Sequence, residues 1–477
     1  MRNGSFVVSA PRDDTHRRLA VGLFVLTFVS YAYFFGGGGW NQNANFDLTR
    51  ALVERHTFAI DAYAHNTGDV SVYRGHVYAN KAPGLSMIAA VPYALGARSM
   101  VACTIAVCAT SGALLIVLIF LYTRSMLIAL TFAFGTYIWA YSSVFFAHVP
   151  AALFLFLAFV RRDNPWIAGV ASALAVLCNY ASLPAVIAIM ILFVVERRSG
   201  IAKFVAAGLP FAILLLAYQA LCFGSPLRTA LEATTSNFRT PGALLGFLNA
   251  PRFDVLIAIL VSRYRGLFFL SPVLVLALGG AMIMVRNRVR LRELATCAAV
   301  FASFLLVNIS FNGWHGGSAI GPRYLLPAIP FLALPMMYAI DRIRTLWFIL
   351  GAISVVFNFA VVAVNPLPSR TIADPIFRYT FPLLITGHLP SDTPPFPPFA
   401  WKLSLGHVSV NRQTDDELAT FEKHPPNSRE SEWASFNAGE FIAPGSVFSL
   451  VPIAIWIIGG SVILIIAARR QQPSPAH

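Results

Sequence analysis

The chain contains little charge and few acids. Only 12% of its 477 residues are Asp, Glu, Lys or Arg, about half the share found in ordinary soluble domains. Hydrophobic residues make up 57% of the chain, and its mean hydropathy is +0.67. These values exclude a soluble globular domain and predict an all-α polytopic membrane protein, because helices satisfy their backbone polar groups within a bilayer.

The five cysteines all lie in apolar runs and lack the spacing of a metal or redox site. They indicate no compartment.

The net charge of +14 comes from short basic clusters between apolar runs, which is typical of cytoplasmic loops. Nucleic acid is therefore not an expected partner. Basic residues precede the first apolar run, and no small-residue cleavage site follows it, which predicts an uncleaved signal anchor.

Apolar runs are long enough for about twelve transmembrane helices, since a bilayer core requires about 20 helical residues. The predicted spans lie near 18–35, 101–121, 126–142, 146–160, 166–180, 183–195, 203–222, 267–285, 294–310, 323–340, 345–364 and 447–467. Residues 225–262 are interrupted by prolines and are predicted to form interfacial helices. We expect a membrane module over 1–365, a small proline-rich outer segment over 366–446, and a last helix with a cytoplasmic tail over 447–477.

Arginine and lysine fall on every second junction between these runs, which predicts the cytoplasmic side. Both termini are in phase with the basic junctions, so both are expected in the cytoplasm. The opposite junctions carry the polar motifs, including a first outer loop over 36–84 and a loop over 311–324. Nucleotide-activated donors are cytoplasmic, so chemistry at the outer face must use a substrate carried across the membrane.

The first outer loop holds four acids in a chain that has few: Asp47, Glu54, Asp61 and Asp69. Asn45 is predicted to cap a helix over 46–55, which places Asp47 in its first turn. An acid there can simply complement the helix dipole. Because three more carboxylates share the loop, Asp47 is also predicted to act in catalysis or binding.

Three cations border the outer motifs, and each has two interpretations. Lys81 lies at a membrane entrance, where it either snorkels or contacts a phosphate. Arg323 follows a turn with four glycines, and Arg265 lies in Ser262-Arg263-Tyr264-Arg265-Gly266. Each arginine is either a lipid headgroup anchor or a bidentate phosphate ligand. Further candidates for a substrate site are His148, Tyr180, Trp314, His315 and Tyr324, although a histidine such as His148 is more often structural.

The order of these motifs resembles the GT-C superfamily of polytopic glycosyltransferases, in particular bacterial relatives of protein O-mannosyltransferases and of the lipid A aminoarabinose transferase. The resemblance rests on Lys81-Ala82-Pro83, Phe146 with His148, Asn179-Tyr180, Phe223-Gly224-Ser225-Pro226, Arg265-Gly266 and Gly321-Pro322-Arg323-Tyr324. It implies a bacterial inner-membrane enzyme that uses a polyprenyl-phosphate sugar donor. The acceptor would be a glycan, a lipid or a protein.

One departure from the family concerns the base. The family's first loop usually has an acidic pair a few residues before an aromatic, and Gln42 and Asn43 occupy those places before Phe46. The nearest carboxylate is Asp47, with Asp61 and Asp69 as alternatives. A carboxylate base and a phosphate clamp of Lys81, Arg323 and Arg265 would suffice for inverting transfer, with no cofactor and no divalent metal.

Two other functions stay open at the sequence level. A lipid or solute transporter usually has charge near the bilayer midplane and repeated halves, and neither is visible here. A binding subunit on the same fold that has lost its acid pair would explain Gln42 and Asn43.

Overall fold

A computed structural model of the chain describes residues 14–37, 39–196, 198–234, 243–244, 247–368, 370, 372–386, 403–404, 407–408, 436–443 and 447–470. Most of the predicted outer segment 366–446 and of the tail after 470 lies outside these residues. The predicted domain boundaries therefore stay predictions.

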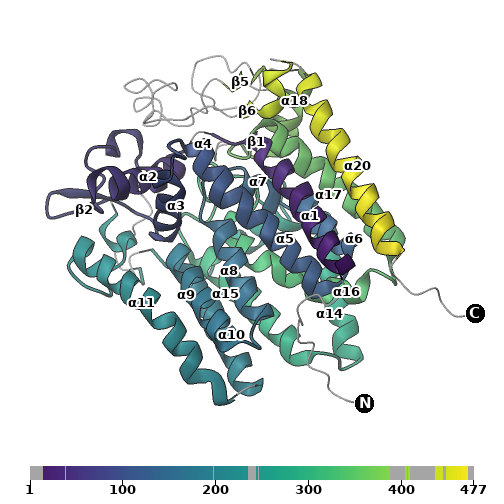
Figure 1. The fold of residues 1–477 in the computed structure, drawn as a ribbon, viewed down its shortest axis with the longest axis horizontal. Coiled ribbons are helices and arrows are strands. Elements are labelled where there is room, and N and C mark those ends of the chain that lie inside the picture. The colour runs from purple at the N-terminus through teal and green to yellow at the C-terminus, as the bar shows by residue number, and fades with distance from the viewer. Residues whose placement is uncertain are drawn as a thin grey trace, which may run out of the picture.

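Helices dominate the described chain (Figure 1). They are α1 (Asp14–Ala32), α2 (Trp40–Arg50), α3 (Gly84–Ala94), α4 (Met100–Cys103), α5 (Thr110–Thr123), α6 (Met126–Phe134), α7 (Ile138–Ser142), α8 (His148–Val160), α9 (Pro165–Cys178), α10 (Leu183–Glu196), α11 (Ile201–Phe223), α12 (Phe253–Leu260), α13 (Leu267–Leu270), α14 (Leu276–Arg286), α15 (Leu291–Ser310), α16 (Ala333–Ala339), α17 (Arg344–Val364), α18 (Phe381–Thr386) and α20 (Val451–Arg469).

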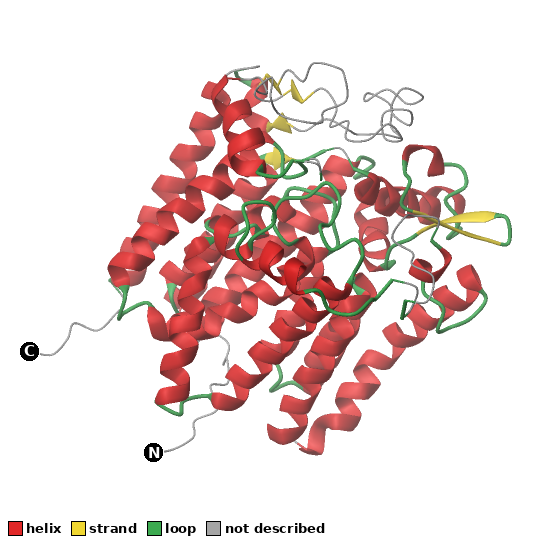
Figure 2. Cartoon of the chain, turned by 180° about the vertical axis from the view of Figure 1, so that it is seen from behind, coloured by secondary structure: helices red, strands yellow, loops and turns green. Residues whose placement is uncertain are grey.

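Strands are few and short in the described residues. The antiparallel pairs are β1 (Phe34–Phe35) with β6 (Phe436–Asn437), β2 (Val70–Tyr73) with β3 (His76–Ala79), and β4 (Leu403–Ser404) with β5 (His407–Val408). The β2–β3 hairpin projects from the helices (Figure 2). The all-α membrane class predicted from composition is thus confirmed.

The number of membrane crossings is not confirmed as twelve. Among the described residues, five helices are long and apolar enough to cross a bilayer: Met100–Thr123, Ile201–Phe223, Leu291–Ser310, Arg344–Val364 and Val447–Arg469. Three predicted spans are interrupted. The 126–142 run breaks between α6 and α7, and the 267–285 run breaks at Ser271-Pro272. The 323–340 run begins as a 3₁₀ helix, Arg323–Leu332, which contains Pro327 and Pro330. Proline removes the backbone donor that an α-helix needs.

Charged side chains meet at one end of the helix bundle. Arg162, after α8, pairs with Glu196 at the end of α10 (2.8 Å) and with Glu293 at the start of α15 (2.9 Å). Arg290 pairs with Glu293 (2.9 Å) and donates to the Tyr122 hydroxyl at the end of α5 (2.6 Å). Basic junctions that the sequence assigned to one side of the membrane therefore lie together in space.

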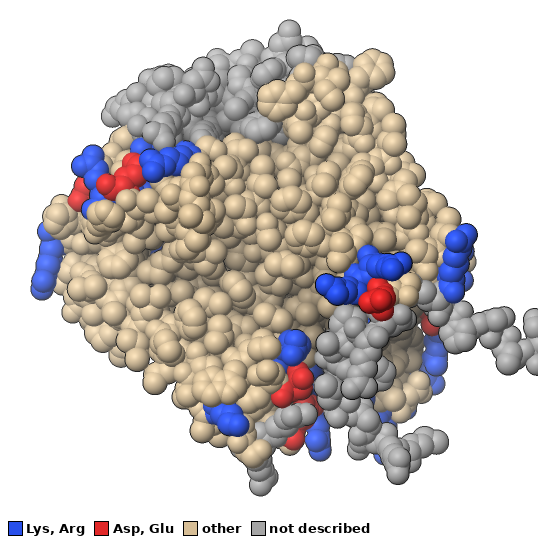
Figure 3. Space-filling model, viewed as in Figure 1, with Lys and Arg blue, Asp and Glu red and all other residues tan. Residues whose placement is uncertain are grey.

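The described ends of the chain lie toward that same end of the bundle (Figure 1). Helices α1 and α20 run antiparallel, since Gly22 approaches Leu464 and Trp456 Nε1 donates to the carbonyl of Leu26 (3.2 Å). On the face shown in Figure 3, a broad band without Lys, Arg, Asp or Glu separates charged groups at the two ends. Such a band suits the hydrocarbon core of a bilayer.

The first outer loop covers the other end of the bundle, and one helix in it begins earlier than predicted. Helix α2 starts at Trp40, so Asn45 lies inside it and is not its cap, and Asp47 lies in its second turn. The reason is packing: Ala44, Leu48 and Ala51 lie on one face and are fully buried in a shared apolar cluster. That stripe extends the apolar period upstream of the predicted start.

The contact between α9 and α11 gives a test of the packing. A Cβ on Gly169 would lie 2.1 Å from the carbonyl oxygen of Phe204, whereas nothing lies within 4 Å of a Cβ on Gly279. We expect Gly169→Ala to lower the thermal unfolding midpoint in detergent by several degrees, because overpacking costs about 1–3 kcal/mol. Gly279→Ala is the control and should leave the midpoint unchanged or raise it slightly. Equal midpoints for the two variants would contradict the packing described here.

Candidate functional site

Cations from distant parts of the chain converge at the polar end that the first outer loop covers. Lys81 follows β3, Arg265 lies in the turn before α13, and Arg323 begins the 3₁₀ helix behind Gly321-Pro322. The charges of Arg323 and Lys81 both act on His148, and those of Arg265 and Arg323 both act on His315. The structure thus brings together the three cations that the sequence predicted as phosphate ligands.

Arg323 is buried among aromatic rings. Its guanidinium lies over the rings of Phe146 (5.1 Å) and Tyr324 (5.0 Å), and its Nη2 donates to the Tyr324 hydroxyl (3.1 Å). A Cβ on Gly316 would lie 2.9 Å from Arg323 Nε, so only glycine leaves room for this side chain. No carboxylate pairs with Arg323 within the described part of the chain. A buried guanidinium without a carboxylate partner is a suitable binding site for an anion.

Arg265 holds the glycine-rich loop in shape. Its side chain is 1% exposed, and it donates Nε to the carbonyl of His315 (3.0 Å) and Nη2 to the carbonyl of Gly317 (3.1 Å). The guanidinium also stacks on Tyr264 at 4.2 Å. Arg265 therefore positions the loop that packs against Arg323. A direct phosphate contact by Arg265 stays a prediction.

His315 is neutral in this environment. Burial, with the positive charges of Arg265, Arg370 and Arg323, lowers the pKa of His315 to about 4. The geometry agrees, because His315 Nδ1 accepts a hydrogen bond from the backbone N–H of Gly317 (2.9 Å). Arg370 was not identified from the sequence. It is tied to the site through the Tyr264 hydroxyl, which donates to its carbonyl (2.6 Å).

Asp69 is the carboxylate that lies beside these cations. Asp69 and Lys81 flank the β2–β3 hairpin, whose register pairs Val70 with Ala79 and brings the two side chains together. Lys81 Nζ lies 2.8 Å from Asp69 Oδ2, and the charge of Asp69 also acts on Arg323. Only the strand pairing makes these two residues neighbours, so sequence spacing could not single out Asp69.

The other three acids of the loop have separate surroundings. Asp47 is fully buried on α2, where it accepts a hydrogen bond from Asn66 Nδ2 (3.3 Å). Glu54 accepts from the hydroxyls of Tyr63 and Tyr93. Asp61 is half exposed and accepts from Val77 N (2.6 Å), with His76 Nδ1 at 2.8 Å. The four carboxylates are close in sequence, but each has its own set of partners.

Gln42 and Asn43 use their amide donors to hold the loop. Gln42 Nε2 donates to the carbonyl of Gly36 (2.6 Å), and Asn43 Nδ2 donates to the carbonyl of Asn66 (2.7 Å). Both side chains are buried. An ionised carboxylate cannot donate, so the departure from the acidic pair has a structural role here.

Most of the remaining predicted residues lie near Arg323. The His148 ring packs edge-on against Tyr324 at 5.7 Å and against Phe146 at 6.0 Å. Trp314 packs on Tyr264 at 5.9 Å, next to His315. Tyr180 is different, since its electrostatic neighbours are Gln219 and Cys222 of α11. The structure does not place Tyr180 among the cations.

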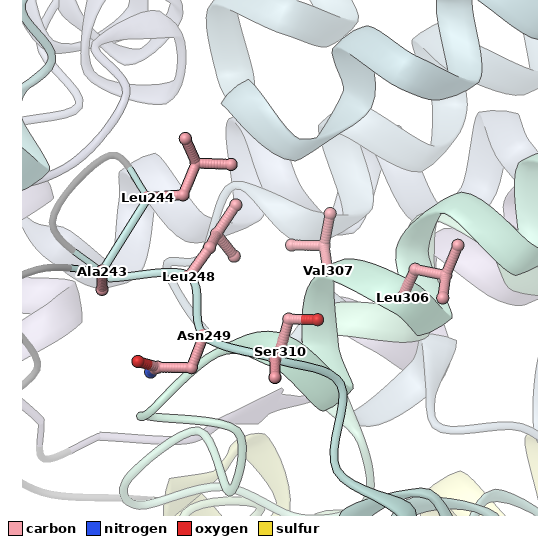
Figure 4. A pocket seen from close by; sticks show the side chains of 8 residues that line it. Ala243, Leu244, Leu248, Asn249, Leu306, Val307 and Ser310 are labelled. Atoms are coloured by element: carbon pink, nitrogen blue, oxygen red, sulfur yellow. The ribbon is translucent and has the colours of Figure 1, made fainter.

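An open apolar pocket of about 530 Å³ lies next to this site (Figure 4). It is lined by the segment before α12 and by the end of α15, through Ala243, Leu244, Leu248, Asn249, Ala250, Leu306, Val307 and Ser310. Leu248 pairs with Phe311 in a β-bridge, and the Phe311 ring contacts that of Tyr324 at 5.5 Å. One aromatic residue thus connects the pocket with the surroundings of Arg323.

Comparisons with known proteins give structural similarities only. No protein-family model and no curated protein sequence matches the chain. Among solved structures, ArnT from Cupriavidus metallidurans bound to undecaprenyl phosphate is 13% identical, with a TM-score of 0.46; the match covers 95% of this chain and 76% of that one. The oligosaccharyltransferase of Archaeoglobus fulgidus is 14% identical, with a TM-score of 0.39; the match covers 74% and 55%.

Both proteins are GT-C members, the superfamily that the motif order resembles.

The neutral state of His315 predicts a dependence of stability on pH. Its folded pKa of about 4 lies below the ordinary value of 6.5, so the unfolded chain binds a proton first as the pH falls. His315 therefore stabilises the fold fully above about pH 6.5 and progressively less toward pH 4. We expect the unfolding midpoint to fall more steeply from pH 7 to pH 5 in the wild type than in His315→Asn, which keeps an acceptor for Gly317 N–H. Parallel curves would contradict this interpretation.

Proposed function

We propose that the chain transfers a sugar from a polyprenyl-phosphate donor to an acceptor hydroxyl at the outer face of a bacterial cytoplasmic membrane. The observation that carries the proposal is the buried guanidinium of Arg323, which has no carboxylate partner within the described chain and whose charge acts on His148 together with that of Lys81. This cationic site lies at the polar end of an apolar helix bundle. That is the depth at which a lipid-linked phosphate would sit.

Lys81 and Arg323 would hold the donor phosphate. Burying a cation without an anion is unfavourable, so a bound phosphate would stabilise the arrangement. Asp69 would keep the Lys81 ammonium in place until the phosphate arrives. Arg265 would act by fixing the backbone of residues 315–317 behind Arg323.

The reaction needs one base and a stabilised leaving group. The acceptor hydroxyl oxygen forms a bond to the anomeric carbon while its proton passes to a carboxylate. The bond from that carbon to the phosphate oxygen breaks, and the electron pair stays on the phosphate, where Lys81 and Arg323 stabilise the charge. In-line attack with a separate base inverts the anomeric centre. No cofactor or divalent metal enters this scheme.

Asp47 is the base that we propose, with Asp69 and Asp61 as alternatives. Asp47 is carried by a rigid helix whose apolar face is fully buried, which suits a group that must be positioned accurately. Because Asp47 is itself fully buried, substrate binding must open access to it. Asp69 is engaged by Lys81, and Asp61 lies on the hairpin with His76.

The polyprenyl tail would lie in the apolar pocket of Figure 4. Leu244 and Leu306 at its rim are 70% and 53% exposed, as expected for side chains that face lipid. The pocket reaches the phosphate site through Phe311 and Tyr324. Head group and tail of one donor would then occupy adjoining sites.

A binding subunit without catalytic activity is the second candidate function. Gln42 and Asn43 favour it. Both side-chain amides donate to backbone carbonyls of the loop, at positions where the GT-C family usually has acids. A lipid or solute transporter is the third. Variants of the loop acids separate these functions from a transferase.

Asp47→Asn, Asp69→Asn and Asp61→Asn test the base. We expect Asp47→Asn to lower transfer by about 10²–10⁴-fold, the usual contribution of a general base. Loss of activity in Asp61→Asn alone would move the role to Asp61, and Asp341→Asn, an exposed aspartate in the turn between α16 and α17, is the control that should retain activity. Mass spectrometry of envelope glycans and lipids, from deletion cells that carry each variant, provides the measurement. Full activity of Asp47→Asn with loss in Asp69→Asn would move the role to Asp69, and an unchanged profile in the deletion itself would reject a transferase.

Arg323→Gln tests the phosphate clamp. Loss of charged hydrogen bonds should weaken binding of polyprenyl phosphate to the purified protein by about 10–100-fold. Arg263→Gln is the control, since that arginine belongs to the neighbouring turn but is largely exposed and paired with Asp374. The assignment fails if Arg323→Gln and the wild type bind the lipid equally well.

A further inference from the structure

A second cationic group lies at the tip of the β2–β3 hairpin, apart from the phosphate clamp. Arg74 and Arg228 both place their guanidinium groups over the ring of Tyr73, at 5.2 and 5.3 Å from its centroid. Arg74 belongs to the hairpin and Arg228 to the segment after α11. We call Tyr73, Arg74 and Arg228 the hairpin-tip cluster.

The positive charge of this cluster is not neutralised within the described chain. Neither arginine forms an ion pair there, and the acids of these two segments have other partners: Asp61 contacts His76, Asp69 contacts Lys81, and Glu232 accepts from Thr229 N. Both guanidiniums contact the same tyrosine ring, which partly compensates a cation for lost water. An anion bound at the tip could accept charged hydrogen bonds from these guanidiniums.

Arg74 occupies a backbone position that arginine rarely takes. The pair Tyr73 and His76 closes a two-residue turn, in which Arg74 has φ +50 and Gly75 has φ +81. Positive φ at both positions is typical of a type I′ turn, where Asn, Asp and Gly are favoured. The turn therefore places the Arg74 side chain at the exposed end of the hairpin, next to Tyr73.

The motif Phe223-Gly224-Ser225-Pro226 presents Arg228 to the same ring. Gly224 ends α11 with φ +78, and a Cβ there would lie 2.1 Å from the Tyr73 hydroxyl oxygen. The turn continues with a hydrogen bond from Arg228 N to the carbonyl of Ser225 (3.2 Å). This explains a sequence motif that the phosphate clamp does not use.

Hydrogen bonds fix the hairpin against the segment after α11. Ser71 Oγ donates to the carbonyl of Ala230 (2.6 Å), and Thr234 Oγ1 donates to the carbonyl of Val70 (3.1 Å). Asn80 Nδ2 donates to Thr234 Oγ1 (3.0 Å). The cluster is thus held rigidly relative to Lys81 at the base of the hairpin. Four strand residues separate base from tip, roughly 13 Å at about 3.3 Å per residue.

We propose that the hairpin-tip cluster binds a phosphate group carried by the sugar acceptor. This rests on the proposed transferase function, and it adds that the acceptor is an anionic glycan bound at the opposite end of the hairpin from the donor phosphate. A discrete ligand suits the cluster better than a flat anionic bilayer, because a bilayer surface would also meet Asp61, whose side chain is 47% exposed beside the same hairpin.

The test measures binding of trehalose 6-phosphate and of trehalose to the full chain in phosphatidylcholine nanodiscs. We expect the wild type to prefer the phosphorylated sugar by about 10-fold or more, the effect of one or two charged hydrogen bonds. The double variant Arg74→Gln/Arg228→Gln should lose that preference. Arg98→Gln, which removes an exposed arginine elsewhere on the loops, should keep it. No preference in the wild type, or an undiminished one in the double variant, would overturn the proposal.

Two further measurements separate the causes of failure. Polyprenyl phosphate should bind the double variant as tightly as it binds the wild type. If the wild type itself does not bind polyprenyl phosphate, the proposed transferase function is rejected, and not the hairpin-tip cluster alone. The preference for trehalose 6-phosphate should persist in nanodiscs that contain phosphatidylglycerol. Its disappearance there would mean that lipid head groups fill the cluster, and the acceptor site would be rejected.

Discussion

The burial of Arg323 against Phe146 and Tyr324 is the interaction on which the site depends. A guanidinium removed from water requires compensation, and here aromatic faces supply part of it. The glycine-rich loop makes this possible, because a side chain at Gly316 would collide with Arg323. Arg265 in turn holds that loop by its carbonyls. Replacing the aromatic rings, Gly316 or Arg265 would therefore disturb the contacts that compensate the buried guanidinium of Arg323.

The β2–β3 hairpin links two cationic sites through one rigid element. Its base carries the pair of Asp69 and Lys81, and its tip carries Arg74 next to Tyr73. Antiparallel pairing sets the distance between base and tip, while Gly224 lets the segment after α11 approach the hairpin. In the proposed function, the hairpin would hold a donor phosphate at its base and an acceptor phosphate at its tip, and positioning two substrates is itself a large part of catalysis.

Packing, and not the local capping signal, sets the start of α2. The expected start at Phe46 came from a plausible cap at Asn45, but burial of Ala44, Leu48 and Ala51 begins the helix at Trp40. Tertiary packing thus overrode a local signal. Proline and glycine likewise interrupted predicted spans, because a run can be apolar enough to cross a bilayer and still be unable to continue as one helix. The charges of the predicted cations act on shared neighbours, whereas the neighbours of Tyr180 are Gln219 and Cys222.

By itself, the sequence determined the helical membrane class and the alternation of basic and polar junctions, because both depend on composition and on residue order along the chain. It also singled out Lys81, Arg265 and Arg323, since cations beside glycine and proline turns are unusual in so apolar a chain. Only the tertiary structure decided that Asp69 is the acid beside Lys81 and that Gln42 and Asn43 donate to backbone carbonyls. It also decided that Arg74 and Arg228 contact the same tyrosine. These facts depend on strand register and on contacts between distant segments, which no local pattern encodes.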